Sequence, residues 1–194
     1  VDTIVAPVTP PGKGGVSIVR ISGPQTSAAV ERYVARSEEV LSQPRRLVFS
    51  KIRDREVESE LDQALCVYFS GAESFTGEHS AEFHLHGSPF LVKRLLDNLT
   101  HIEGVRLAEP GEFSKRAFLN GKLDLSQAEA IADLINAETA SQARLAREQL
   151  HGKLSRAVQE LGEPLRDVLA EIEAFIDFPE EDIELKSIEA WTKV

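Results

Sequence analysis

One side chain in this 194-residue sequence that could do chemistry is a lysine on a predicted turn. The Asn-Gly pair at 120–121 is a strong turn signal, because both residue types tolerate a positive φ, and Lys122 follows it directly. Before the turn, Phe113, Ala117 and Phe118 recur at helical spacing and are expected to face a core. A lysine held between two helices can meet an anion, but a solvated surface lysine explains the same pattern.

A second helix is expected to begin just after this lysine. Ser126 can cap it, and Glu129 completes a capping-box pattern three residues on. We therefore expect a helix, a tight turn that carries Lys122, and a second helix over 126–150.

A second candidate group is Glu82, His84 and His86. They occupy every other position of a predicted strand, so their side chains share one face of a sheet. Two histidines and a carboxylate could bind a metal ion, but no further ligand is evident and histidines on a strand face are commonly just polar. We expect no metal site there.

Arg20 lies near the end of another predicted strand, and a polar, glycine-bearing loop over 71–78 leads into the strand that carries Glu82. An ion pair between Arg20 and Glu82 explains both residues at least as well as a ligand does. From the residues alone, a binding role and a structural role both stay open.

The Gly-Lys-Gly-Gly run at 12–15 invites comparison with a phosphate-binding loop, and the comparison fails. That motif has the form Gly-x-x-x-x-Gly-Lys-Ser/Thr. Pro7 and Gly14 stand where it needs the first glycine and the hydroxyl residue, so we expect no GTP hydrolysis by this loop.

Charge and cysteine content narrow the class of protein. Residues 1–123 carry 15 Lys and Arg against 16 Asp and Glu, whereas residues 124–190 carry 6 against 16, so nucleic acid should avoid the acidic part. The one cysteine, Cys66, lies in an apolar strand-like run and is expected to be buried and inert. A single cysteine fits a reducing cytosol, and no apolar run reaches the roughly 18 residues that a membrane span needs. We expect a cytoplasmic protein.

Strands and helices are intermixed over residues 1–119, which predicts an α+β domain, and residues 120–194 are expected to form a helical part. Strands are expected at 3–8, 16–21, 45–51, 61–69, 81–86 and 105–107, and helices at 25–36 and 89–99. The second of these helices is expected to pack Phe90, Leu91, Leu95, Leu96 and Leu99. The charged run at 53–56 is typical of an exposed turn.

Apolar residues also form a long seam near the end of the chain. They alternate spacings of four and three at Leu154, Val158, Leu161, Leu165, Val168, Ile172 and Phe175. Such a seam must bury against another helix, and the helix at 126–150 cannot cover it fully. Pro164 predicts a kink or break near 161–163, and the helix should end at 177–182.

Several segments together resemble one known family. They are 2–6, 9–16 and 20–23, then Ser-Phe-Thr-Gly-Glu at 74–78, His-Gly-Ser-Pro at 86–89, the segment 110–130, and Asp-Phe-Pro-Glu-Glu at 177–181. They resemble the bacterial tRNA-modification GTPases called MnmE or TrmE, over nearly the whole chain. The segment 110–130 is similar to the junction between the folate-binding and helical domains of that family.

The resemblance implies a ligand and its residues. The N-terminal domain of the family is a folate-binding domain, similar to that of glycine-cleavage aminomethyltransferases, which takes 5-formyl-tetrahydrofolate and makes the homodimer. The ligand residues of the family fall on Arg20, Glu82 and Lys122 of this chain. Glu82 would accept paired hydrogen bonds from the pterin, and the two cations would meet folate oxygens.

The resemblance also implies a longer protein. In the family a G domain that uses GTP, Mg²⁺ and K⁺ is inserted in the helical domain. With the partner MnmG, the protein installs a 5-aminomethyl-type group on the wobble uridine of tRNA. This sequence ends where the G domain is expected to begin, so by itself it is expected to bind folate and dimerise without catalysis.

Two rivals remain. One is a stand-alone folate-dependent one-carbon transferase, for which Asp124 is the acid–base candidate. The other is a dimerisation scaffold that binds no folate.

Overall fold

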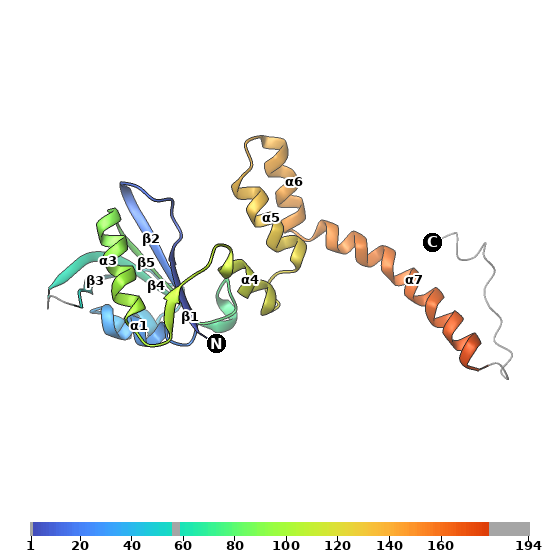
Figure 1. The fold of residues 1–194 in the computed structure, drawn as a ribbon, viewed down its shortest axis with the longest axis horizontal. Coiled ribbons are helices and arrows are strands. Elements are labelled where there is room, and N and C mark those ends of the chain that lie inside the picture. The colour runs from blue at the N-terminus through green and yellow to red at the C-terminus, as the bar shows by residue number, and fades with distance from the viewer. Residues whose placement is uncertain (1, 56–58, 179–194) are drawn as a thin grey trace. The chain divides into compact units, whose positions relative to one another are not determined.

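Among the described residues, six strands form one mixed sheet (Figure 1). They are β1 (Thr3–Pro7), β2 (Gly14–Ser22), β3 (Val48–Arg53), β4 (Glu60–Phe69), β5 (Ser80–Gly87) and β6 (Val105–Leu107). Their order is β3-β4-β5-β2-β1-β6; β1 and β6 are parallel and the other neighbours are antiparallel. This computed structural model describes residues 2–55 and 59–178, and it confirms the predicted α+β fold with a mixed sheet.

Helices cover one face of the sheet, and the other face carries both polar and apolar side chains. The helices of this part are α1 (Thr26–Tyr33), α2 (Ser37–Ser42), α3 (Pro89–Thr100) and α4 (Glu112–Leu119), with a short 3-10 helix η1 (Gly71–Glu73). Val19 and Phe83 are fully buried in one core with residues of α1 and α3. Because successive strand residues point to opposite faces, Arg20, Glu82 and His84 project from the other face.

The helical part contains α5 (Leu125–Ile135), α6 (Ala140–Leu150) and α7 (Lys153–Asp177) (Figure 1). The chain divides into two compact units between Leu123 and Asp124, whereas the sequence places the division between 119 and 120. Within the part of the chain that the structure describes, no helix combines the length and apolar character that crossing a membrane requires.

The cap predicted at Ser126 is wrong. Asp124 caps α5: its Oδ1 accepts from the Gln127 backbone N–H at 2.8 Å, and the Gln127 Oε1 accepts from the Asp124 N–H at 2.9 Å. The capping box therefore closes two residues earlier, because an aspartate with a glutamine three residues on satisfies the first free N–H groups. The buried Ser126 hydroxyl has no hydrogen-bond partner among the described residues.

The single helix expected over 126–150 is wrong too, since α5 and α6 are separate. Thr139 caps α6 by accepting from the Gln142 N–H at 3.2 Å, and Gln142 closes a second capping box. This Thr-x-x-Gln pattern is visible in the sequence, and it marks a helix start inside the segment that apolar spacing joined.

Pro164 does not end α7, which runs from Lys153 to Asp177 as one helix. A proline removes one backbone donor, and the hydrogen bonds on either side can still hold the helix together. The apolar seam of α7 is largely exposed; Leu161 and Leu165 are 72% and 70% exposed. The helix ends at Asp177, within the range predicted for its end.

Other expectations differ in detail. Phe90 and Phe118 were expected in the core, but they are 70% and 40% exposed, whereas Leu95, Leu99 and Ala117 are buried. The helix expected over 25–36 ends earlier and is followed by α2, and β3 starts at 48 rather than at 45. Of the predicted turn at 53–56, residue 56 lies outside the described residues.

We predict that Asp124→Ala lowers the free energy of unfolding by about 1–2 kcal/mol, because it removes a helix cap. Ser126→Ala is the matched control and should leave stability unchanged or slightly raised, since the hydroxyl has no described partner. Urea unfolding followed by circular dichroism measures both. A larger loss in the serine variant than in the aspartate variant would contradict the assignment of the cap.

Candidate functional site

Arg20 and Glu82 are paired across neighbouring strands. They lie opposite each other in the register of β2 and β5. The Arg20 Nε and Nη2 atoms both donate to Glu82 Oε1, at 2.9 and 2.7 Å. The two side chains are 26% and 14% exposed, so the ion pair is partly shielded from water. The Arg20–Glu82 ion pair, which the sequence offers as an alternative to a ligand, is therefore present.

His84 holds the second oxygen of the same carboxylate. Its Nε2 lies 3.2 Å from Glu82 Oε2. An ionised carboxylate only accepts, so in this contact Nε2 carries the hydrogen. His86 does not join them: it is mostly exposed and its Nδ1 lies 2.7 Å from Asp62 Oδ1. Among the described residues, no group of three or more His, Cys, Asp or Glu side chains could hold a metal ion.

Two aromatic rings face the Arg20 guanidinium. Its Cζ lies 5.6 Å from the ring centre of Phe75 and 5.7 Å from that of Phe113. Phe75 belongs to the loop between η1 and β5, and Phe113 belongs to α4. A cation over a ring face is attracted by the ring quadrupole, so the rings help to hold the guanidinium in place.

A cavity of about 220 Å³ opens beside the ion pair. It is lined by Arg20, Phe69, Glu73, Phe75, Ser80 and Glu82. A larger cavity of about 400 Å³, lined mainly by apolar residues of loop 7–12 and α3, contains none of the predicted ligand residues. We place the candidate site at the smaller cavity, because charged and aromatic groups converge there.

Lys122 does not line this cavity. Its Nζ donates to the Ala72 carbonyl at 2.6 Å, in the 3-10 helix whose Glu73 does line it. The turn at 120–122 packs on the same loop: Gly77 has a positive φ, and a Cβ there would lie 2.9 Å from the Asn120 Cβ. The structure therefore brings Arg20 and Glu82 together and leaves Lys122 against the outer side of the loop.

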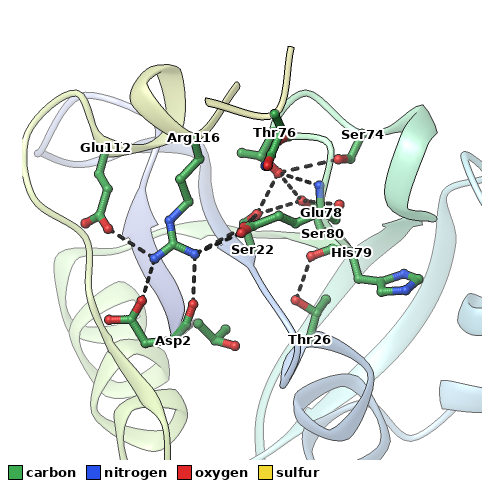
Figure 2. A network of polar contacts seen from close by, with 12 residues as sticks. Asp2, Ser22, Thr26, Ser74, Thr76, Glu78, His79, Ser80, Glu112 and Arg116 are labelled. Carbon is green, nitrogen blue, oxygen red and sulfur yellow. Dashed lines mark hydrogen bonds and ion pairs between the residues drawn. The ribbon is translucent and has the colours of Figure 1, made fainter. Parts of the chain in front are cut away.

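A buried arginine ties the elements around the cavity together (Figure 2). Arg116, on α4, donates through Nη2 to Asp2 Oδ1 at 2.8 Å and to Glu112 Oε1 at 3.1 Å. Its Nη1 lies 3.2 Å from both carboxylate oxygens of Glu78. The arginine thus joins the start of β1, the loop before β5 and α4. Arg116 was not singled out from the sequence. Its spacing of four from Glu112 on one helix was visible there, but Asp2 and Glu78 lie far away along the chain and leave no spacing signal.

Hydroxyl groups fasten the loop 74–80 to β2 (Figure 2). The Ser22 Oγ lies 2.7 Å from Thr76 Oγ1 and donates to Glu78 Oε2 at 2.9 Å. Ser80 Oγ donates to Ser22 Oγ at 3.1 Å, and Ser74 and Thr76 are in contact at 3.4 Å. A signal for this was available, since the loop has a polar residue at every even position from 74 to 80.

His79 anchors the end of the same loop, just before β5. Its Nδ1 lies 2.6 Å from the Tyr68 hydroxyl and accepts from the Gly71 N–H at 3.3 Å. Thr26 donates to the His79 carbonyl at 2.9 Å (Figure 2). Because Nδ1 accepts, the ring hydrogen of the neutral form sits on Nε2. The end of the loop is therefore tied to α1, to β4 and to the first residue of η1.

Glu112 is the most strongly perturbed acid of the network. Arg106 donates to its two oxygens at 2.6 and 2.8 Å, and these hydrogen bonds lower the pKa of the carboxyl from 4.5 to about 2 against the opposing effect of burial. Burial raises the pKa of the Cys66 thiol to about 12, and the predicted burial of this cysteine is confirmed.

Two family models together match almost the whole chain. One describes the N-terminus of the GTP-binding protein TrmE and matches residues 3–122; the other describes the MnmE helical domain and matches residues 125–194. The chain belongs to the MnmE family. The predicted family is thus confirmed, and Arg20, Glu82 and Lys122 all lie within the residues matched to the TrmE N-terminus. Their part in ligand binding stays a prediction.

The relatives share one name, "tRNA modification GTPase MnmE". The MnmE of Phenylobacterium zucineum is 48% identical over 182 residues, which are 94% of this chain and 40% of that protein. The MnmE of Proteus mirabilis is 44% identical over 186 residues, 96% of this chain and 40% of that protein. The chain therefore spans about two fifths of the length of these MnmE relatives.

We predict that the Arg106–Glu112 pair stabilises the fold only above acidic pH. A depressed pKa adds stability that is fully present above pH 4.5 and is lost as pH falls toward 2. Glu112→Gln should therefore cost about 2 kcal/mol of unfolding free energy near neutral pH, and this difference from the parent should shrink as pH falls through that window.

Urea unfolding at several pH values measures this difference. Glu60→Gln removes a surface ion pair with Lys51 and is the matched control, with little effect expected at any pH. A cost of Glu112→Gln that stays constant from neutral pH to pH 2 would show that the ion pair is not its source.

Proposed function

We propose that this chain binds 5-formyl-tetrahydrofolate at the cavity beside Arg20 and Glu82, as part of a tRNA-modifying MnmE. The observation that carries the proposal is the convergence of a carboxylate, a guanidinium and an aromatic ring on one cavity. A pterin presents an amino group and a ring N–H side by side, and a carboxylate accepts such a pair. Family membership supports the same ligand class.

The size of the cavity suits one end of a folate. Its volume of about 220 Å³ is below the roughly 300–1,000 Å³ of pockets that enclose drug-sized ligands. The pterin would sit against Glu82 and Phe75, and the remainder of the folate would extend outside. Lys122 does not line the cavity. Its ammonium group suits the negatively charged tail of the folate, which would extend outside.

Binding would require an exchange of partners at Glu82. Both hydrogen bonds from Arg20 now use Oε1, and Oε2 receives His84. Paired donors of a pterin need both oxygens, so they would replace at least one bond from Arg20. The freed guanidinium could then meet a formyl or carbonyl oxygen of the ligand. The ion pair thus keeps the carboxylate hydrogen-bonded until a ligand arrives.

The function of the longer protein is part of the same proposal. With MnmG, it would install a 5-aminomethyl-type group on the wobble uridine of tRNA in the cytoplasm, using GTP, Mg²⁺ and K⁺ in a G domain. The name of the relatives supports the tRNA substrate and the GTPase activity. The chain described here would supply folate binding and dimerisation, and no catalysis of its own.

The rival one-carbon transferase loses its acid–base candidate. The Asp124 carboxylate caps α5 and also accepts from the Ser155 hydroxyl at 2.7 Å. The Ser155 hydrogen bond, followed by that from the Gln127 backbone, lowers the pKa of this carboxyl. A carboxylate of lowered pKa is a weak base, and these contacts give Asp124 a structural role.

We predict that 5-formyl-tetrahydrofolate binds the parent chain and binds Glu82→Gln at least about tenfold more weakly, because a buried charged acceptor is lost. Arg20→Ala should also weaken binding. Glu60→Gln, which breaks the ion pair between Glu60 on β4 and Lys51 on β3, is the matched control and should bind like the parent. Isothermal titration calorimetry measures all four. A folded parent that binds no folate would refute the proposed function and favour the scaffold.

We predict that the chain is a dimer in solution, with twice its mass of 21.4 kDa. Exposed apolar side chains on the sheet are available to a second copy: Phe49 and Leu65 are neighbours in register and are 54% and 40% exposed. Sedimentation equilibrium measures the mass. A single species of 21.4 kDa at micromolar concentration would contradict dimerisation by this part of the protein.

A further inference from the structure

We propose that His84 is a positioning residue that holds the Glu82 carboxylate in its receiving orientation while Arg20 is exchanged for the ligand. The inference rests on the proposed folate binding and assigns a role within it to a residue outside the cavity. His84 is not among the residues that line the cavity, so it acts through Glu82 and not by touching the ligand.

The two oxygens of Glu82 are held in different ways. Oε1 receives both hydrogen bonds from Arg20, and Oε2 receives the single hydrogen bond from His84 Nε2 at 3.2 Å. His84 and Glu82 stand two residues apart on β5 and share one face of the sheet. Their contact is therefore built on one rigid strand and does not depend on the loop that carries Phe75.

The different partners of the two Glu82 oxygens matter when a ligand binds. Once a pterin donor replaces Arg20 on Oε1, the guanidinium no longer fixes the carboxylate, and its terminal torsion is broad and roughly two-fold. The His84 hydrogen bond still holds Oε2 through one of its lone pairs, so this oxygen can accept the second pterin donor without turning away. The imidazole is itself confined, because Leu65 on β4 and Ile18 on β2 flank it in register. Its side chain is only 21% exposed.

The chain allows a sharp test, because glutamine can donate from a similar position and leucine cannot. We expect His84→Gln to bind 5-formyl-tetrahydrofolate within about twofold of the parent, and His84→Leu to bind about tenfold more weakly. Isothermal titration calorimetry on the 194-residue chain gives the dissociation constants. Unfolding midpoints show that each variant is folded.

A double-mutant cycle separates positioning from a general structural effect. If His84 acts through the Glu82 carboxylate, then His84→Leu should cost less than about twofold when added to Glu82→Gln. A local distortion would weaken binding equally in both backgrounds, and that result would overturn the proposal. Equal affinity of the parent and His84→Leu would overturn it as well, and so would equal losses in His84→Gln and His84→Leu. Where Glu82→Gln binds too weakly to measure, the contrast between glutamine and leucine decides.

The outcomes also distinguish this role from the proposed function. Binding by the parent with an unaffected His84→Leu variant removes the role of His84 and leaves folate binding standing. Absence of binding by the folded parent removes both.

Discussion

The guanidinium of Arg116 is the interaction on which the arrangement of the candidate site depends. It is a nearly buried cation, and a buried cation is tolerated only when carboxylates and carbonyls surround it. Its partners Asp2, Glu78 and Glu112 come from the start of the chain, the loop before β5 and α4. The loop and α4 also carry the rings of Phe75 and Phe113. The buried arginine therefore helps to hold the two elements from which both rings reach Arg20.

Two kinds of support hold the site. Arg20, Glu82 and His84 stand on neighbouring strands whose backbone hydrogen bonds fix their spacing. Phe75 and Lys122 stand on a loop and a turn that have no ladder to hold them, and they rely on side-chain contacts such as the Ser22 hydroxyl and the Ala72 carbonyl. The strands supply the charged recognition groups with little freedom, whereas the loops shape the cavity around them. The proposed ligand would then need to displace only side-chain hydrogen bonds and not the strands that carry them.

Period-two spacing predicted the part of the site that lies on strands. It put Glu82, His84 and His86 on one face. The Arg20–Glu82 pair was considered only because each residue lies near the end of a predicted strand, and the register that makes them neighbours comes from the structure. It could not predict that Lys122 would meet a backbone carbonyl, since a carbonyl has no side-chain signature. The helix over 126–150 failed for a different reason: apolar spacing runs through the break, and the caps at Asp124 and Thr139 decide the boundaries. Arg116 showed only its local pairing with Glu112 four residues earlier, because its other partners, Asp2 and Glu78, are distant in the sequence.

The buried thiol of Cys66 can report on local opening of this sheet. It is the sole cysteine in the sequence, it lies on β4 between β3 and β5, and its pKa of about 12 leaves almost no thiolate at neutral pH. A thiol reagent can therefore react only after this edge of the sheet opens and water reaches the sulfur. The rate of alkylation reports that opening, and a ligand bound at the cavity lined by Arg20, Phe69 and Glu82 would slow it without touching the cysteine. Cys66 therefore allows the rate of local unfolding to be measured without introducing a label site.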